Sequence, residues 1–170
     1  LSATMPPAIR RIARHHLREP EHVVVQAQTV TVENTEQRVA IVPEELKLEA
    51  VARILETEEP EATLIFTRTR LGAAELAEKL SARGFPAESL HSDLSQSQRL
   101  TVLSRLRERR AQVVVATDVA ARGLDIQEMP CVINYELPHS PEDYVHRIGR
   151  TGRAGAEGDA ISFFSPDEEK

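Results

Sequence analysis

Short apolar runs that alternate with helical patterns predict an α/β fold, with a mostly parallel central sheet covered by helices on both faces. Three runs are continuous and apolar, as expected of strands buried on both faces: 62–66, 113–116 and 131–135. Between them, residues 71–80 and 95–106 place apolar side chains at helical spacing. Strands that alternate with helices are joined by crossover connections, so neighbouring strands are expected to run parallel.

The flanking segments extend the same alternation. Residues 8–17 and 46–55 have helical spacing, and the first of these follows a pair of prolines that suits a helix start. Residues 23–25, 30–32 and 159–164 have the composition of extended chain. The resulting pattern places a final strand close to the end of the chain, before a polar tail.

Several helix ends are marked by particular residues. Ser95 with Gln98 three positions later forms a capping-box pattern. Ser140 followed by Pro141 and two acidic residues is a strong signal for a helix N-terminus. Gly84 ends the helix predicted over 71–80.

Composition limits the class of protein. The chain has 170 residues, 41% hydrophobic and 28% charged, which is typical of one soluble globular domain. Its single cysteine, Cys131, excludes an internal disulfide framework and favours a reducing compartment. No run is long enough for a membrane span, and the histidines lack metal-ligand spacing, so neither a membrane nor a metal site is expected. Because the first residue is Leu1 rather than Met, we expect a piece of a longer protein.

The charge argues against bulk electrostatic binding of nucleic acid, because the net charge is −6. A small number of placed phosphate contacts is compatible with that charge. Lysine occurs only at positions 47, 79 and 170, and all other Lys/Arg positions hold arginine, whose planar fork suits phosphate. A GC-rich or heat-adapted genome gives the same bias.

Unusual residues lie near the ends of the predicted strands, where function concentrates in open α/β sheets. They occupy three segments, 67–70, 117–125 and 146–153, which we expect to converge on one edge of the sheet. Each segment also has an ordinary interpretation. The second is explained by a strand-to-helix turn capped by Asp118, and the third by a solvated basic loop.

The third segment is the most informative, because Arg147, Arg150 and Arg153 recur every three residues with Gly149 and Gly152 between them. Arginine forks match phosphate oxygens, and glycine lets the backbone approach a ligand. The chain has no GxxxxGK[ST] phosphate loop. A phosphate-binding arginine cluster without that loop predicts half of a nucleotide site, with the other half elsewhere.

Six segments resemble, in order, motifs of the C-terminal RecA-like lobe of DEAD-box ATP-dependent RNA helicases: 2–4 (SAT), 66–69 (FTRT), 96–99 (QSQR), 116–125 (ATDVAARGLD), 132–138 (VINYELP) and 146–153 (HRIGRTGR). The resemblance implies a RecA-like three-layer domain over residues 25–170. It implies that residues 1–24 are the end of the first lobe and the interlobe linker. Two positions depart from the family pattern, Ser92 where glycine is common and Glu136 where aspartate is common.

The resemblance implies an ATP site shared with a missing N-terminal lobe, which would hold ATP and its Mg²⁺. Arg150 and Arg153 would be arginine fingers that stabilise charge on the transferred phosphoryl group. Asp125 would bind the ribose hydroxyls, and Gly123 would permit that approach. The full-length protein would then hydrolyse ATP, whereas this chain alone is expected to be inactive.

The resemblance also implies contacts with RNA and between the lobes. Four polar residues would contact the RNA sugar-phosphate backbone without reading its sequence: Thr69, Gln96, Arg99 and Thr117. Three basic residues would join the network between the two lobes: Arg122, His146 and Arg147. Cysteine usage and the family together imply a cytoplasmic protein.

Two other functions remain open. A DNA helicase or translocase of the same superfamily would share many of these features, and stimulation by RNA rather than DNA separates the two. A non-catalytic binding or dimerisation module would have no need of the arginine set. We therefore expect an RNA-dependent ATPase that unwinds duplexes locally when its lobes close.

Overall fold

A single parallel sheet forms the centre of the molecule. The computed structural model describes residues 7–16, 18, 34–122, 126, 128–152 and 156–166. Among these residues, six strands form a sheet of order β1-β6-β5-β2-β4-β3, and all five strand pairings are parallel. The strands are β1 (Thr35–Ile41), β2 (Thr63–Thr67), β3 (Ala87–Leu90), β4 (Val113–Thr117), β5 (Cys131–Asn134) and β6 (Gly158–Phe164).

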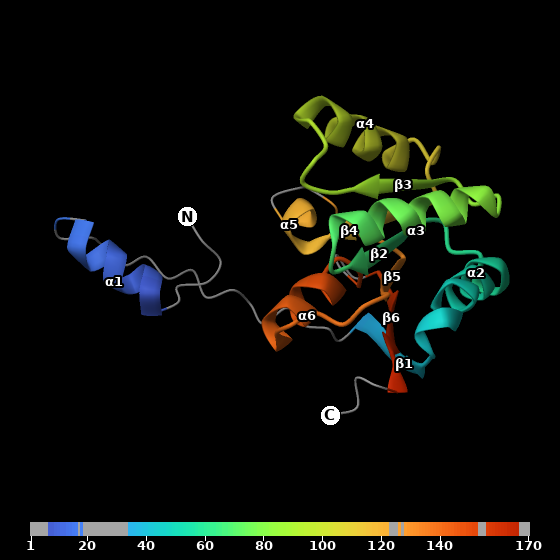
Figure 1. The fold of residues 1–170 in the computed structure, drawn as a ribbon, viewed down its shortest axis with the longest axis horizontal. Helices are drawn as coiled ribbons and strands as arrows, with labels where there is room; N and C mark the ends of the chain where they lie inside the picture. The colour runs from blue at the N-terminus through green and yellow to red at the C-terminus, as the bar shows by residue number, and fades with distance from the viewer. Residues whose placement is uncertain are drawn as a thin grey trace.

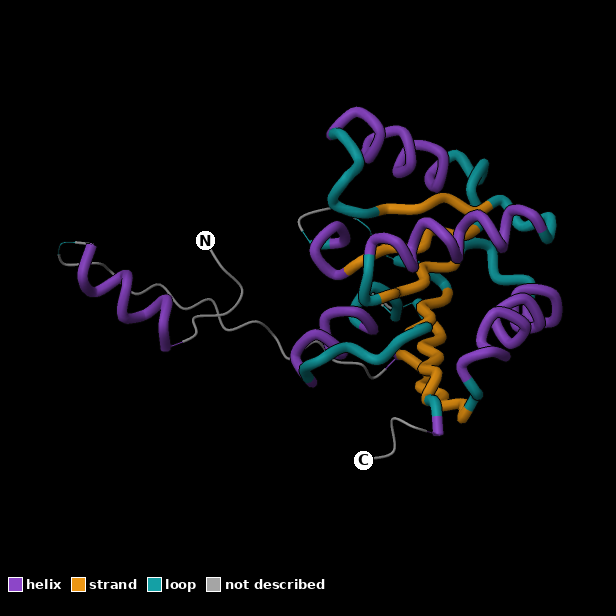
Figure 2. The backbone as a smooth tube through the Cα atoms, viewed as in Figure 1, coloured by secondary structure: helices purple, strands orange, loops and turns teal. Residues whose placement is uncertain are grey.

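Helices connect the strands and cover the sheet on both faces (Figures 1 and 2). They are the short 3-10 helix η2 (Glu44–Leu46), α2 (Lys47–Glu58), α3 (Arg70–Ala82), α4 (Gln96–Arg107), α5 (Asp118–Ala121) and α6 (Pro141–Ile148). A further helix, α1 (Pro7–His16), precedes the first strand and connects no strands. This arrangement confirms the predicted α/β class with its parallel sheet.

Two apolar layers hold the helices against the sheet. On one face, residues of α2 and α3 such as Leu55 and Leu80 pack against Ile65, Val115 and Phe163 of the strands. The other face of the same strands packs against α4 and α5. Because successive side chains of a strand point to opposite faces, β2 and β4 supply both layers, and every residue of these two strands is buried.

The predicted helix starts are confirmed. Gln98 N donates to Ser95 Oγ, and Ser95 N donates to Gln98 Oε1, which completes the capping box of α4. Asp143 N donates to the Ser140 side chain at the start of α6. Gly84 follows α3 with a φ of +93°, a conformation that glycine adopts without strain.

The sequence pattern missed the two edge strands. β1 has the sequence TEQRVAI and is largely exposed, and β3 has only four residues. A strand at the edge of a sheet is bonded on one side only, so its composition need not be apolar. The extended runs predicted at 23–25 and 30–32 lie outside the described residues.

Burial controls the chemistry of Cys131. Desolvation, together with nearby acidic residues such as Asp159, raises the pKa of its thiol to about 12. The thiolate, whose usual pKa is about 8.5, is the reactive form. Because the pKa of the thiol is higher in the folded than in the unfolded protein, this group stabilises the fold at pH values below the pKa of the unfolded thiol. The contribution is lost as the pH rises from that value toward 12.

We expect Cys131 to react with an aromatic disulfide reagent only through unfolding. At about pH 8, native protein should label at least about 100-fold more slowly than protein in concentrated urea, because the folded thiol is both buried and protonated. The chain has one cysteine, so the released chromophore measures this residue alone. Equal rates in the two conditions would contradict the buried, protonated thiol.

Candidate functional site

A buried arginine joins the ends of three strands to α6. The Arg147 side chain is 1% exposed, and its Nε and Nη2 donate to the two carboxylate oxygens of Asp118, each at 2.7 Å. Its Nη1 donates to Asn134 Oδ1 at 3.2 Å and to the Glu136 carbonyl at 2.7 Å. The guanidinium carbon lies 5.0 Å from the centre of the Phe66 ring. This set of contacts fixes α6 against β2, β4 and β5.

The fold explains why these residues meet. Phe66 lies near the carboxyl end of β2, Asp118 directly follows β4, and Asn134 ends β5. Parallel strands bring their carboxyl ends to the same edge, and α6 places Arg147 over that edge. The convergence expected for the three segments is seen for Asp118 and Arg147, which form an ion pair, and for Thr67, which is paired with Thr117 beside them.

The ordinary interpretation of Asp118 as a helix cap is wrong. Thr117 occupies the N-cap position of α5 and makes no side-chain cap hydrogen bond, while Asp118 is the first helical residue. The carboxylate of Asp118 binds Arg147 in a bidentate pair instead. Charge-assisted bidentate pairs are among the stronger hydrogen-bonded contacts in proteins.

A small hollow lies beside this pair and carries most of the predicted basic residues. Its lining comes from β2, the β4–α5 junction and α6: Phe66, Asp118, Ala121, Arg122, Asp143, His146, Arg147 and Arg150. Arg122 forms an ion pair with Asp143, and His146 is exposed. The carboxylates in the hollow are thus engaged by Arg147 and Arg122. Gly123, Asp125 and Arg153 lie outside the described residues.

Arg150 is held by the loop that precedes β5. Met129 N donates to the Arg150 carbonyl at 3.0 Å, and Arg150 Nη1 donates to the Ile126 carbonyl at 3.4 Å. Arg150 is half-buried, whereas Arg147 is buried. The two arginines therefore have different surroundings although they are three residues apart.

Gly152 serves packing between segments. Its φ is +65°, and a Cβ there would lie 2.1 Å from Thr35 Oγ1. From the sequence, the glycines of this segment were expected to permit close approach of a ligand. For Gly152 the structure gives a different reason, which is close approach to the start of β1.

The four polar residues predicted to contact RNA follow three adjacent strands. Thr117 ends β4 and pairs with Thr67 in β2, and Thr69 lies two residues further along. Gln96 and Arg99 occupy the first turn of α4, which follows β3. Since β2, β4 and β3 are neighbours in the sheet, these four residues lie near one edge of it, where Thr117 is buried.

Local contacts hold this row of residues. Thr69 Oγ1 accepts a hydrogen bond from Gly72 N and caps α3. Arg99 Nη2 donates to the Ser92 carbonyl at 3.3 Å. An ion pair of 2.8 Å between Arg70 and Asp93 joins α3 to the loop before α4. These contacts connect Thr69 to α3 and Arg99 to the loop before α4, and an ion pair joins the two regions.

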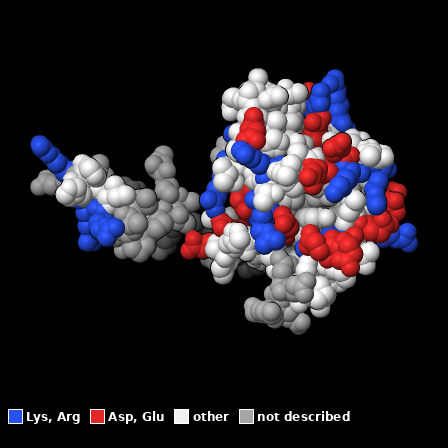
Figure 3. Space-filling view, in the orientation of Figure 1, with Lys and Arg blue, Asp and Glu red and all other residues white. Residues whose placement is uncertain are grey.

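The surface charge is mixed. Figure 3 shows Lys/Arg and Asp/Glu side chains interspersed over the face that it presents. Many are paired, as in Arg38–Glu58 at 2.7 Å and Arg83–Glu49 at 2.7 Å. The hydrogen bond from Arg38 lowers the pKa of Glu58. Such pairing weakens any long-range field of one sign.

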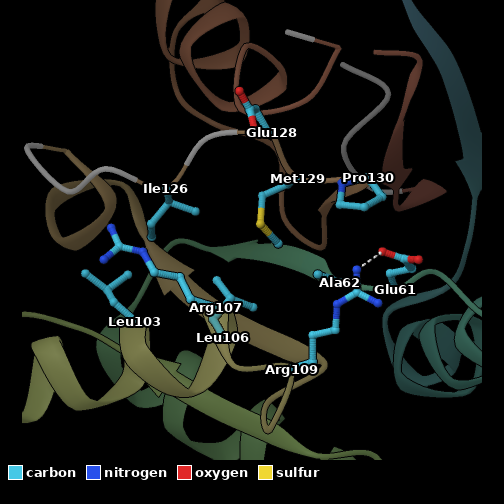
Figure 4. Close-up of a pocket in the computed structure, with 10 residues that line it drawn as sticks. All are labelled: Glu61, Ala62, Leu103, Leu106, Arg107, Arg109, Ile126, Glu128, Met129 and Pro130. Atoms are coloured by element: carbon cyan, nitrogen blue, oxygen red, sulfur yellow. Dashed lines mark ion pairs between the residues drawn. The ribbon is translucent and has the colours of Figure 1, made fainter. Parts of the chain in front are cut away.

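A separate pocket of about 220 Å³ lies at the amino ends of β2 and β5 (Figure 4). Its lining is Glu61, Ala62, Leu103, Leu106, Arg107, Arg109, Ile126, Glu128, Met129 and Pro130. An ion pair of 3.0 Å between Arg109 and Glu61 closes one side (Figure 4). One wall, at Ile126 and Met129, is the loop that holds Arg150.

The sequence did not identify two partners of Arg147. Asn134 and Phe66 were each expected as part of a strand and of a family motif, with no role of their own. Both are buried, and a polar residue at the end of an otherwise apolar strand is the signal that could have marked Asn134. In the described part of the chain, no group of His, Cys, Asp and Glu side chains could hold a metal ion. No described helix is long and apolar enough to cross a membrane.

Comparison with known proteins gives consistent matches. Residues 46–155 match the family described as the helicase conserved C-terminal domain. The chain is 50% identical to the DEAD-box ATP-dependent RNA helicase CshA of Geobacillus kaustophilus and 48% identical to CshA of Bacillus subtilis, in each case over 98% of the chain. It covers 36% and 34% of these relatives, about a third of their length.

A solved structure shares the fold. The crystal structure of a DEAD box protein from the hyperthermophile Methanococcus jannaschii superposes with a TM-score of 0.75 and 41% identity. The match covers 98% of this chain and 45% of that chain. At this identity the likeness extends to sequence as well as fold.

Replacement of Asp118 by asparagine tests the buried pair. Asp118→Asn leaves Arg147 buried without its counter-charge, so the free energy of unfolding should fall by about 3 kcal/mol. That figure is at the lower end for a buried pair because the Asp118 side chain is 28% exposed. Urea denaturation followed by circular dichroism measures the loss.

Glu49→Gln is the matched control, because it removes one partner of the exposed Arg83–Glu49 pair. Its effect should stay below about 1 kcal/mol. Equal losses for Asp118→Asn and Glu49→Gln would show that burial of Arg147 does not depend on Asp118.

Proposed function

Because this chain belongs to the helicase conserved C-terminal domain family and is the RecA-like C-terminal lobe of a DEAD-box helicase, we propose that it supplies half of an RNA-dependent ATPase that separates RNA duplexes locally. The lobe would extend over residues 25–170, and residues 1–24 would be the end of the first lobe and the linker. The observation that best supports this proposal is the convergence of three segments on Arg147: 66–69, 117–122 and 146–150.

The row formed by Thr69, Thr117, Gln96 and Arg99 suits an RNA backbone. It follows three adjacent strands along one edge of the sheet and carries hydroxyl, amide and guanidinium donors. Donors of this kind bind phosphate and sugar oxygens, which position a strand without reading its bases. A few placed contacts agree with a chain whose net charge is −6.

The hollow beside Arg147 is too small to enclose a phosphate, but its basic rim would face an anionic group brought against it. Arg122, His146 and Arg150 line it, and its carboxylates already bind arginines. A phosphate would therefore meet donors rather than unpaired acidic groups. In the proposed enzyme, the N-terminal lobe holds ATP and Mg²⁺, and the nucleotide supplies the phosphoryl group that is transferred to water.

Arg150 and Arg153 would act as arginine fingers on that phosphoryl group. Asp125, with the space that Gly123 provides, would bind the ribose hydroxyls. Arg122, His146 and Arg147 would belong to the network between the lobes, with Arg147 acting from inside the domain because it is buried. RNA and ATP would both favour the closed arrangement, in which the fingers reach the phosphate. We place this activity in the cytoplasm.

Arg150→Ala in the full-length protein should abolish most RNA-stimulated ATP hydrolysis. Arginine fingers contribute about 10³–10⁵ in rate in well-studied phosphoryl-transfer enzymes, so we expect a loss of at least about 10³-fold. Nucleotide binding, followed with a fluorescent ATP analogue, should persist because the other lobe holds the nucleotide. Arg83→Ala, which removes an exposed arginine of the α2–α3 pair, is the control.

Three results would contradict parts of the proposal. Normal hydrolysis by Arg150→Ala would remove the finger assignment. Equal stimulation of the wild type by single-stranded DNA and RNA would favour the DNA translocase instead. A full-length protein that binds RNA but hydrolyses no ATP would favour the non-catalytic module.

The isolated chain provides a separate prediction. Residues 1–170 should not hydrolyse ATP above background, with or without RNA, because we place the nucleotide, its metal ion and the groups that activate water in the other lobe. A coupled phosphate-release assay on the purified chain makes the measurement. Turnover that follows the protein through two purification steps would place the whole site within this chain.

A further inference from the structure

The sheet opens between β2 and β5 at the edge that carries the site. The register of these two strands ends at Phe66 and Asn134, while β2 and β4 stay paired as far as Thr67 and Thr117. Beyond this point, Tyr135 N and Glu136 N both donate to the Phe66 carbonyl, at 3.1 and 3.4 Å. The next backbone N–H of this chain that faces β5 is that of Arg68. It therefore has no carbonyl of β5 opposite it.

The Glu136 side chain takes the place of that missing carbonyl. Arg68 N donates to Glu136 Oε2 at 2.7 Å, and Arg68 Nε donates to Glu136 Oε1 at 3.2 Å. The glutamate side chain is 18% exposed and the arginine 40% exposed. One carboxylate thus binds both the backbone and the side chain of Arg68, and charged acceptors of this kind form the stronger hydrogen bonds.

The same residue contacts the buried arginine through its backbone. The Glu136 carbonyl accepts a hydrogen bond of 2.7 Å from Arg147 Nη1. Glu136 therefore lies between two parts of the proposed machinery. Its side chain fixes the strand-end loop (Thr67, Arg68 and Thr69), and its backbone belongs to the Arg147 network.

The strand-end loop also has contacts of its own and contacts with neighbouring elements. Thr67 Oγ1 donates to the Thr69 carbonyl at 3.2 Å, and the Thr69 side chain caps α3. These contacts lie within the loop or between the loop and α3. The bonds to Glu136 tie the loop to the segment that follows β5, and through the Glu136 backbone to Arg147.

We propose that Glu136 is a positioning residue that orients the strand-end loop for contact with the RNA backbone and couples that loop to Arg147. This inference rests on the proposed function, since it assigns a role in RNA binding. Glu136 touches neither RNA nor nucleotide in this scheme. It acts through Arg68 and Thr69, so its loss should weaken RNA engagement more than nucleotide binding.

Two substitutions of Glu136 in the full-length protein separate positioning from general structure. Glu136→Ala removes both acceptors, and we expect the RNA concentration for half-maximal ATPase stimulation to rise about tenfold. Glu136→Gln keeps an amide oxygen within reach of Arg68 N but loses the ion pair, so a rise of about two- to threefold is expected. The KM for ATP should not change in either variant.

Glu49→Ala is the matched control, because it removes a glutamate that binds Arg83 on another side of the domain. It should behave as the wild type. Hydrogen exchange of the peptide that contains Arg68 and Thr69 gives a readout independent of RNA. Exchange should be faster in Glu136→Ala than in the wild type, and Glu136→Gln should restore most of the protection.

The outcomes distinguish the inference from the function on which it rests. Unchanged half-saturation by RNA in Glu136→Ala would overturn the positioning role. Equal losses in RNA half-saturation, ATP KM and thermal midpoint in both variants would reduce Glu136 to a structural residue. A wild type that RNA does not stimulate would overturn the proposed function and the RNA role of Glu136 together, and the exchange data would still show whether Glu136 orders the loop.

Discussion

A charged side chain in the interior of a small domain constrains everything around it. Removing a guanidinium from water is costly, and the charge is tolerated only with an opposite charge and enough acceptors for its fork of N–H donors. Arg147 meets this requirement with the Asp118 carboxylate, the Asn134 side chain, the Glu136 carbonyl and the face of Phe66. These partners lie at or just after the ends of three strands. Their hydrogen bonds to one guanidinium therefore fix the relative positions of the strand ends.

The arginine that anchors the edge is distinct from the one proposed to act on phosphate. Arg147 uses its donors within the domain and is buried. Arg150, one helical turn later, is half-buried beside the hollow and is held by the loop at Ile126 and Met129. Because Arg147 is fixed, the nearby backbone of Arg150 is held in place as well. Cations stabilise a transition state best when their positions need no adjustment during the reaction.

The sequence predicted the structure where either burial on both faces or local hydrogen bonding determines a segment. β2, β4 and β5 are buried on both faces, so their continuous apolar runs could be recognised, and the caps at Ser95 and Ser140 follow from local hydrogen bonding. The exposed β1 carries no such requirement and was missed. Asp118 was misinterpreted because an acidic residue at a helix start fits both a cap and a distant ion pair. The role of Glu136 depends on the point at which β2 and β5 separate, which only the three-dimensional register reveals.

Recognition by a few ordered groups and recognition by a broad charged surface make different demands on a protein. A basic surface binds nucleic acid through counterion release and needs little local order. Here the described surface is mixed and many of its charges are paired, so little binding can come from the field of the whole domain. In the proposed enzyme, affinity for RNA would then depend on the exact placement of a few hydroxyl, amide and guanidinium donors. The polar contacts around the proposed site hold loops and helix ends in place, and Glu136 and Arg147 connect the edge proposed to bind RNA with the hollow proposed to face a phosphate.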